Sequence, residues 1–268
     1  MGEALQTALT DRYSALSTSL RDRVISFVLA AFEGLGSYRD ADSDLFIERV
    51  LPIVLAAQQQ MGAVTDAYLS AMIADMAGGS SASAGVVVDQ ALRGVPPAEV
   101  YRRPFVTAYT ALSRGHDYVD AIGQARTRLL SITETDMQLA RTQAARQSMT
   151  RRGGAQFYRR RMTGTKNCAL CTIASTQRYR VADLMPIHPG CHCEPEPLPG
   201  TKDPGHVIDE QLLKDAHDAI ARDIGQSDAG GRAPDYRHLI VTREHGEYGP
   251  LLAVRRQNFT GPDDVPAA

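Results

Sequence analysis

All four cysteines of this 268-residue chain lie between residues 168 and 193, and the first 167 residues contain none. Cys168 and Cys171 form a C-x2-C pair, and His188-Pro-Gly-Cys191 is an H-x2-C pair in which Pro-Gly supplies a tight turn. Cys193 follows two residues later, so in an extended segment its side chain shares a face with that of Cys191. Two such turns can direct thiolates and an imidazole at one metal ion. The spacing therefore predicts a metal site.

Five good candidates compete for the four positions of a tetrahedral site: Cys168, Cys171, His188, Cys191 and Cys193. Either Cys191 or His188 can be the spare, and His192 is a poorer sixth candidate because it points away from Cys193 in an extended segment. Sulfur with one imidazole favours zinc over an iron–sulfur cluster, which usually takes four thiolates. The alternatives are buried thiols without a metal and a redox C-x2-C pair, and the latter lacks a surrounding βαβ pattern.

The predicted role of this zinc is structural. Proline and glycine are frequent between residues 186 and 205, and helical periodicity disappears across the cysteine region. A segment of about 35 residues with that composition buries too little apolar surface to fold unaided. Structural zinc contributes on the order of 10 kcal/mol in finger peptides, which is enough to order such a segment.

Catalysis is the poorer interpretation, because four protein ligands leave no position for an activated water. His192-Cys193-Glu194 supplies the H-x-E of zinc deaminases, but it follows the C-x2-C pair, where those enzymes have the reverse order. The chain has no H-E-x-x-H, G-x-S-x-G or phosphate-binding glycine motif. We expect no enzymatic activity, with a zinc hydrolase or deaminase as a minor alternative.

The first 150 residues are predicted to be helical. Apolar residues at spacings of three, four or seven place one stripe on the first helix: Leu5, Leu9, Leu16, Leu20, Val24, Phe27 and Ala31. The expected helices run to about Gly34, from Leu45 (with Ser43 as a cap) to Met76, from Pro96 to about Leu112, and from Tyr118 to about Ser148. Short connections between long amphipathic helices are typical of a bundle.

The predicted fold is mainly α, with an N-terminal helical bundle followed by a small zinc-stabilised α+β domain and a C-terminal β-hairpin. The pattern after the cysteines predicts a short helix from Ile208 to Ile224, a linker from Gly225 to Pro234 and two strands between Arg237 and Arg256. The expected divisions are residues 1–150 for the bundle, 151–205 for the basic segment and zinc knot, and 206–268 for the short helix, linker, hairpin and flexible tail.

A strongly basic stretch precedes and enters the cysteine cluster. Between Asp136 and Asp183 there are ten basic residues and no acidic one, a local charge of +10 in a chain with a formal net charge of −2. This asymmetry predicts a surface that contacts nucleic acid or an acidic protein. The residues expected to contact nucleic acid are Arg151, Arg152, Arg159, Arg160, Arg161 and Lys166. The stretch can also have no specific role, since arginine outnumbers lysine throughout the chain and arginines offset the charge of a zinc–thiolate site.

No membrane segment or secretory signal is expected. The best apolar run, Val24 to Phe32, is far shorter than the roughly 20 residues that span a bilayer. The N-terminus has an early glutamate and no basic region. We therefore expect the chain in the cytoplasm, where thiols stay reduced and a metal site is a better account of the cysteines than disulfides.

A C-x2-C pair followed about twenty residues later by H-P-x-C-x-C resembles the motif of the MuF-like minor head proteins of tailed bacteriophages. The run RRPFVTAYTALSRGHDYVDAIGQARTRLLSITETDMQLARTQAARQ is similar to the helical region before that motif in phages of actinobacteria, and REHGEYGPLLAVRRQNFTGPDDV is similar to their C-terminal hairpin and tail. The resemblance covers roughly Tyr101 to Val265.

The resemblance implies a non-enzymatic minor capsid protein in the virion, associated with the phage portal protein inside the capsid and present in the host cytoplasm before assembly. It implies a role in head assembly and in DNA packaging or delivery, with packaged double-stranded DNA contacted non-specifically. Major capsid or scaffolding protein is a further candidate partner. The alternative reading is a zinc-dependent nucleic-acid-binding regulator, although no recognition helix stands beside the cysteine cluster.

Overall fold

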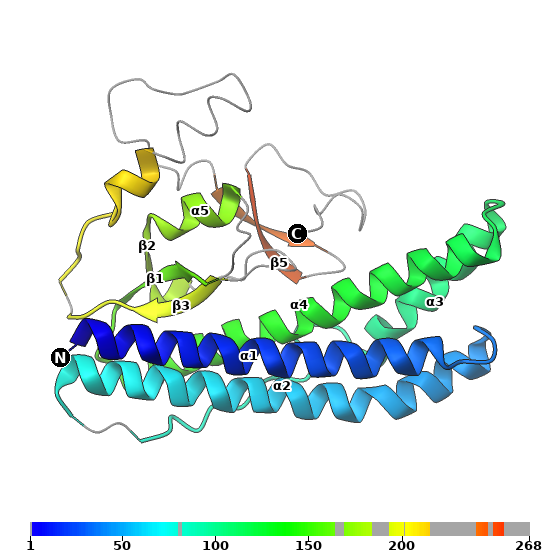
Figure 1. Ribbon diagram of the computed structural model, residues 1–268, viewed down its shortest axis with the longest axis horizontal. Coiled ribbons are helices and arrows are strands. Elements are labelled where there is room, and N and C mark those ends of the chain that lie inside the picture. Colours follow the sequence, from blue (N-terminus) through cyan, green and yellow to red (C-terminus); the bar gives the residue numbers. More distant parts are fainter. Residues whose placement is uncertain are drawn as a thin grey trace.

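The chain is mainly helical and carries a small three-stranded antiparallel sheet (Figure 1). The computed structural model describes residues 2–79, 82–163, 169–183, 193–200, 202–214, 240–245 and 249–254. Four long helices come first: α1 (Gly2–Glu33), α2 (Asp40–Ala77), α3 (Pro97–Ser113) and α4 (Tyr118–Arg152). The predicted helical first part is therefore confirmed. In the described part of the chain, no helix combines the length and the apolar character that crossing a membrane requires.

Local signals set the ends of these helices. The backbone N–H of Arg39 donates to the Asp42 carboxylate at 3.2 Å, so α2 begins at Asp40 rather than at the expected Leu45. Ser43, predicted to cap α2, is instead buried within it. Asp117 caps α4 by accepting from the N–H of Asp120 at 2.8 Å.

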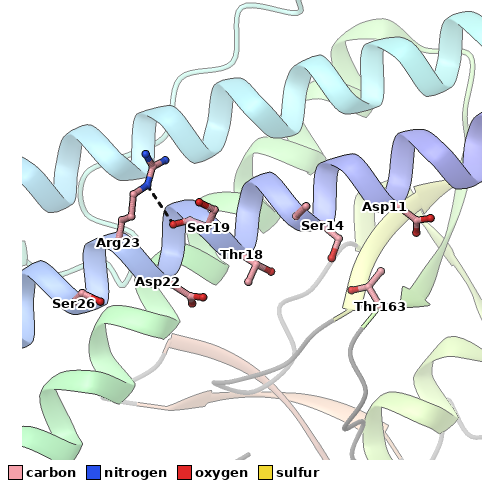
Figure 2. A pocket seen from close by; sticks show the side chains of 9 residues that line it. Asp11, Ser14, Thr18, Ser19, Asp22, Arg23, Ser26 and Thr163 are labelled. Atoms are coloured by element: carbon pink, nitrogen blue, oxygen red, sulfur yellow. Dashed lines mark hydrogen bonds between the residues drawn. The ribbon is translucent and has the colours of Figure 1, made fainter.

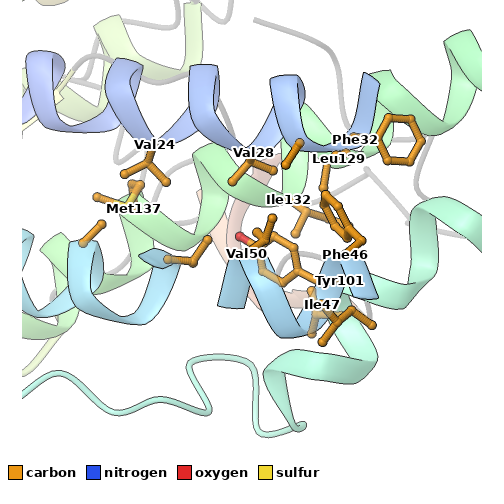
Figure 3. Packing of buried hydrophobic residues seen from close by; sticks show 14 of the residues in the cluster. Val24, Val28, Phe32, Phe46, Ile47, Val50, Tyr101, Leu129, Ile132 and Met137 are labelled. Atoms are coloured by element: carbon orange, nitrogen blue, oxygen red, sulfur yellow. The ribbon is translucent and has the colours of Figure 1, made fainter. Parts of the chain in front are cut away.

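The helices pack around α4, which contacts α1, α2 and α3. Their core is built from aliphatic and aromatic side chains of all four helices, as Figure 3 shows around Val28, Val50, Tyr101 and Ile132. Phe32 lies at the α3 end of this core and makes an edge-on contact with Phe105, their ring centroids 5.5 Å apart. All four helices of the expected bundle therefore contribute to one large apolar cluster.

The predicted apolar stripe of α1 is only partly correct. Leu20, Val24 and Ala31 are buried as expected, but Leu5 and Leu16 are 44% and 48% exposed. In their place the N-terminal half of α1 buries polar side chains, namely Thr10, Tyr13 and Ser17. Polar side chains are buried here because this half of α1 lies beside charged groups of the three-stranded sheet, such as Glu194.

A segment without helix or strand, residues 82–95, lies between α2 and α3 and is hydrogen-bonded by glutamine side chains; we call it the strap. Gln59 of α2 donates to the carbonyl oxygen of Val88 at 2.6 Å and accepts from its N–H at 3.2 Å. Gln147 of α4 makes the same two contacts with Val87, at 2.9 and 3.3 Å. Side-chain amides thus satisfy a backbone that has no partner strand.

The sheet has the order β2-β1-β3, with β1 (Phe157–Met162) in the centre. Both β2 (Arg178–Arg180) and β3 (Cys193–Pro197) pair with β1 antiparallel. Helix α5 (Ala169–Ser175) precedes β2, and a 3-10 turn, η1 (Val181–Asp183), follows it. The expectation that helical structure disappears across the cysteine region is wrong at α5.

The predicted C-terminal hairpin is confirmed: β4 (Ile240–His245) pairs antiparallel with β5 (Gly249–Val254). Of the short helix expected from Ile208, residues 210–214 are helical and the remainder lies outside the described residues. The expected linker and tail also lie outside them.

Candidate metal centre

The structure describes two of the five predicted zinc ligands, and both are buried thiols. Cys171 lies in α5 and is 2% exposed, and Cys193 is the first residue of β3 and is 4% exposed. Cys168, His188 and Cys191 lie outside the described residues, as does Lys166 of the basic set. Among the side chains that are described, no three His, Cys, Asp or Glu residues form a group able to hold a metal ion.

Cys193 and α5 lie on the same face of the sheet, which we call the outer face. In the β1–β3 register Cys193 opposes Met162 and Pro195 opposes Arg160, and opposed residues of an antiparallel pair share a face. Arg160 lies over the ring of Tyr179, which donates from its hydroxyl to the carbonyl oxygen of Ala174 in α5 at 2.8 Å. In Figure 1, α5 lies on the side of the sheet away from α1.

The opposite, inner face carries two buried glutamates and faces the bundle. Glu194 is 2% exposed, and the guanidinium of Arg141 from α4 lies 3.1 Å from its carboxylate. The hydroxyl of Ser17 from α1 donates to the same carboxylate at 3.4 Å. Glu196 is 4% exposed and accepts from Arg159 at 2.8 Å and from Arg161 at 3.2 Å. The Arg141–Glu194 ion pair thus connects the sheet to α4, whereas the two pairs of Glu196 connect β1 to β3.

Aromatic hydroxyls of the bundle lie next to these glutamates. The rings of Tyr13 and Tyr68 stack with centroids 4.3 Å apart, and the hydroxyl groups of Tyr13 and Thr65 lie 2.8 Å apart. Burial raises the pKa of Tyr13 well above its usual value, and the negative charge of Glu194 raises it further. Tyr13 therefore remains a neutral hydrogen-bonding group at physiological pH.

The five described arginines of the predicted nucleic-acid surface all make contacts within the chain. Arg159 and Arg161 pair with Glu196. Arg152 pairs with Asp66 of α2 at 2.7 Å, and Arg151 donates to the carbonyl oxygen of Gly85 in the strap at 2.6 Å. The fifth, Arg160, is 7% exposed and lies on the outer face. Much of the local charge of +10 is therefore offset by carboxylates distant in sequence.

Sequence reasoning missed the acidic partners of these arginines. Glu194 and Glu196 alternate in a short strand, a pattern that could have placed both on one face, but nothing in the sequence pairs them with Arg141 or Arg159. The same holds for Asp136 of α4, which pairs with Arg93 and accepts from the hydroxyl of Tyr101 at 2.8 Å.

Two cavities lie beside α1 in the described part of the chain. A groove of about 830 Å³ runs along α1 and is lined mainly by small polar side chains, among them Ser14, Thr18 and Ser26, with Thr163 opposite (Figure 2). A cavity of about 30 Å³, room for a water molecule, lies beside Arg141, Glu194 and Glu134. Burial raises the pKa of Glu134, and nearby Arg21 opposes that shift. Among the described residues that line either cavity there is no cysteine or histidine nucleophile.

No protein-family model matches this chain, and no curated protein or solved structure was found to be similar to it. The comparisons therefore assign no family to the chain. We infer its function from the motif residues and from their placement in the fold.

Proposed function

We propose that this chain is a structural minor capsid protein of a tailed phage, associated with the portal vertex inside the head and contributing to head assembly and to DNA packaging or delivery. The observation that carries the proposal is the placement of Cys171 and Cys193. Two cysteines separated by a Pro- and Gly-rich segment are buried on α5 and β3, on one face of a small sheet supported by a helical bundle. This placement supports the proposal, because buried thiols on two neighbouring elements can supply two of the four ligands of a structural zinc.

The two described candidate ligands, Cys171 and Cys193, have the chemistry that zinc prefers. Buried thiols are soft ligands suited to zinc, and a buried arginine close by offsets the negative charge of thiolates. Zinc would be held by four of Cys168, Cys171, His188, Cys191 and Cys193. When bound, it supplies cross-links between α5 and β3 in place of an apolar core.

The position of Glu194 supports a structural zinc site rather than a catalytic one. Successive side chains of a strand point to opposite faces, so Glu194 points away from the face that carries Cys193. Its carboxylate is held by Arg141 and Ser17 beneath the sheet. A general acid or base for a zinc-bound water would have to lie on the outer face.

We propose that exposed members of the basic stretch, such as Arg151 and Arg159, contact packaged DNA without sequence preference. The side chain of Arg159 is 42% exposed although it pairs with Glu196. Arg159→Gln is expected to reduce the slope of log affinity against log salt concentration by up to about 1, since one phosphate contact is lost. Arg102→Gln is the matched control, because Arg102 is 46% exposed, pairs with Asp44 and lies outside the stretch. Equal salt slopes for the two variants would contradict the proposed contact between Arg159 and DNA.

We propose that the helical bundle, residues 1–150, docks on the portal. Apolar side chains are exposed at the end of the bundle where α3 meets α4, including Tyr109 at 46% and Val119 at 78%. A contiguous exposed apolar surface marks a protein–protein contact, and we propose that these side chains form such a surface. Major capsid or scaffolding protein is the other partner that this surface could meet during assembly.

Co-sedimentation with portal oligomers, together with elemental analysis, tests the proposal. The wild-type chain is expected to carry one zinc per molecule and to sediment with the portal. Tyr109→Ser combined with Val119→Ser is expected to abolish sedimentation and keep the zinc. Leu5→Ser is the control, since Leu5 is 44% exposed in the first turns of α1, and the N-terminal end of α1 lies at the opposite end of the bundle from the α3–α4 junction in Figure 1. A wild-type chain that ignores the portal, or that contains no zinc, contradicts the proposal.

A further inference from the structure

Consecutive backbone groups of the strap bond to opposite helices. Val87 exchanges two hydrogen bonds with the side-chain amide of Gln147 on α4. The next residue, Val88, exchanges two with the amide of Gln59 on α2. Neighbouring residues of a β-strand direct their N–H and C=O groups to opposite sides in the same way. The strap is therefore bound like a strand, with side-chain amides in the place of partner strands.

The glutamines of α4 have the spacing that an extended backbone requires. Gln143, one turn before Gln147, accepts from the N–H of Asp89 at 2.6 Å. The two amides of α4 thus hold strap residues that are two apart, Val87 and Asp89. Four residues of a helix rise about 6 Å, and two residues of a strand rise about 6.6 Å. Because these repeats match, α4 can bind the backbone of an extended segment whatever its outward side chains are.

Small residues form the floor beneath the strap. A Cβ placed on Gly62 of α2 would lie 2.6 Å from a methyl carbon of Val88 and 3.8 Å from the Cβ of Ala144 on α4. Val88 is 1% exposed, whereas Val87 is 65% exposed. The seam between α2 and α4 thus combines amides that bind backbone with a pocket for one branched side chain. Sites that bind extended peptides use the same combination.

The middle of the strap is less firmly attached than its ends. Buried carboxylates hold the ends: Asp66 accepts from the N–H of Ala84 at 2.8 Å, and Asp136 pairs with Arg93. Gly85 follows the first of these anchors with a φ of 64°, a conformation that glycine adopts freely. Between the anchors the bonds to α4 are exposed, so water competes for the same groups. A groove of about 510 Å³ along α2, beside Gly85, leaves room for a second segment to approach.

We propose that the seam between α2 and α4 is a binding groove for an extended segment of a partner protein, and that the strap occupies it in cis as an autoinhibitory contact. The partner segment carries a β-branched residue at the position of Val88, because Gly62 and Ala144 leave room for one. When that segment binds, the strap bows out between Ala84 and Arg93. The groove depends on neither the zinc site nor the portal contact proposed above.

A fluorescent peptide with the strap sequence, residues 82–95, tests the groove by fluorescence polarisation with the full chain. Val88→Asp in the chain is expected to unseat the strap, because a buried carboxylate without a partner is costly. Since apparent affinity is proportional to the fraction of molecules in which a site is open, this chain is expected to bind the peptide at least about 10-fold more tightly than wild type. Val87→Asp is the matched control, because it places the same charge on an exposed residue and is expected to stay within about twofold of wild type.

Changes in the peptide and in the glutamines test how the groove binds. In the peptide, Val88→Asp is expected to abolish binding to the Val88→Asp chain, and Val87→Asp to leave it within about twofold. Adding Gln147→Met to the Val88→Asp chain is expected to weaken binding about 5-fold or more, since two backbone hydrogen bonds are lost. Gln124→Met is the control, at an exposed position near the other end of α4.

A peptide that binds none of the chains, or binds wild type and both aspartate variants equally, overturns the groove. Binding that survives Val88→Asp in the peptide, or that Gln147→Met leaves unchanged, overturns it as well. A wild-type dimer that the peptide dissociates would place the strap of a second copy in the groove and overturn the assignment to another protein.

Should the Val88→Asp chain fail to fold, hydrogen exchange of the wild-type chain decides. Residues 86–89 are expected to exchange through a local opening that leaves the centre of α2 protected. Exchange of the strap only together with α2 is the contrary result.

Discussion

Asp66 connects three separate segments through a single buried carboxylate. One oxygen accepts from Ser148 of α4 at 2.6 Å and from Arg152 at 2.7 Å. The other accepts from the hydroxyl of Ser83 at 2.7 Å and from the N–H of Ala84 at 2.8 Å, both in the strap. Burial by itself would raise the pKa of Asp66, but these four donors outweigh burial and hold the pKa below its usual value. The carboxylate therefore contributes to stability in its ionised form.

Asp66→Ala is expected to lower the free energy of unfolding by about 3–5 kcal/mol, because it leaves the buried guanidinium of Arg152 without its carboxylate. Asp44→Ala removes an exposed pair with Arg102 and is expected to cost less than about 1 kcal/mol. Urea denaturation at pH 7 measures both. Equal costs would mean that the Asp66 network adds nothing beyond a surface ion pair.

The pH dependence of these variants follows from the same shift. Since the folded-state pKa of Asp66 is depressed, its contribution is complete above the unfolded pKa of about 3.9 and is lost as the pH falls through the folded value. Wild type is therefore expected to lose more stability than Asp66→Ala on acidification below about pH 4.

Helix α1 illustrates what could and could not be predicted from the sequence at the scale of one element. Its helical character and its end before Gly34 follow from periodicity and from the glycines. The face it buries does not, because Thr10 and Ser17 are buried by contact with Tyr68 and Glu194, which are distant in sequence. Apolar periodicity detects only the half of a helix that meets an apolar neighbour.

Strand β1 shows the same limit. Its sequence, FYRRRM, has no alternation of apolar and polar residues, so it was interpreted as part of a basic surface. The alternation is present in a different form: Arg159 and Arg161 face buried carboxylates, whereas Arg160 faces aromatic rings. Charge pattern alone cannot separate an arginine exposed to solvent from one paired in the interior.

The strap provides a test at the scale of packing between elements. A Cβ placed on Gly62 of α2 would lie 2.6 Å from a methyl carbon of Val88. Val88 is 1% exposed, is stiff at its first torsion and is held by Gln59, so it cannot easily move aside. Val88 of the strap therefore packs directly against the backbone of α2 at Gly62.

Gly62→Ala is expected to destabilise the chain by about 1–3 kcal/mol through overpacking. Gly123→Ala in α4 meets no atom within 4 Å and is expected to stabilise it by about 0.5–1 kcal/mol, because alanine is the better helix former. Thermal unfolding of the two variants compares the same substitution at a crowded site and at an open one. A stabilised Gly62→Ala would mean that the strap lies further from α2.

Across the whole molecule, two layers are held by different forces. The bundle has a large apolar core of its own. The sheet shares a smaller cluster with it, in which Tyr158 and Val181 join Leu69 and Met149. A buried ion pair between Arg141 of α4 and Glu194 of β3 also links it to the bundle, and Cys193 lies on its outer face. Stability is therefore expected to be unequal, with the sheet opening more easily than the bundle.

Removing the proposed zinc with a chelator tests this division. We expect hydrogen exchange to increase in peptides that cover α5 and strands β1 to β3, because the proposed zinc would supplement the small apolar cluster of this segment. Peptides from the centres of α2 and α4 are expected to stay protected, since residues such as Val50 and Leu129 lie in the separate apolar core. The far-UV signal should change little, because the long helices dominate it. Exchange that rises equally throughout the chain would show that the bundle depends on the metal, and exchange that rises nowhere would show that the sheet folds without it.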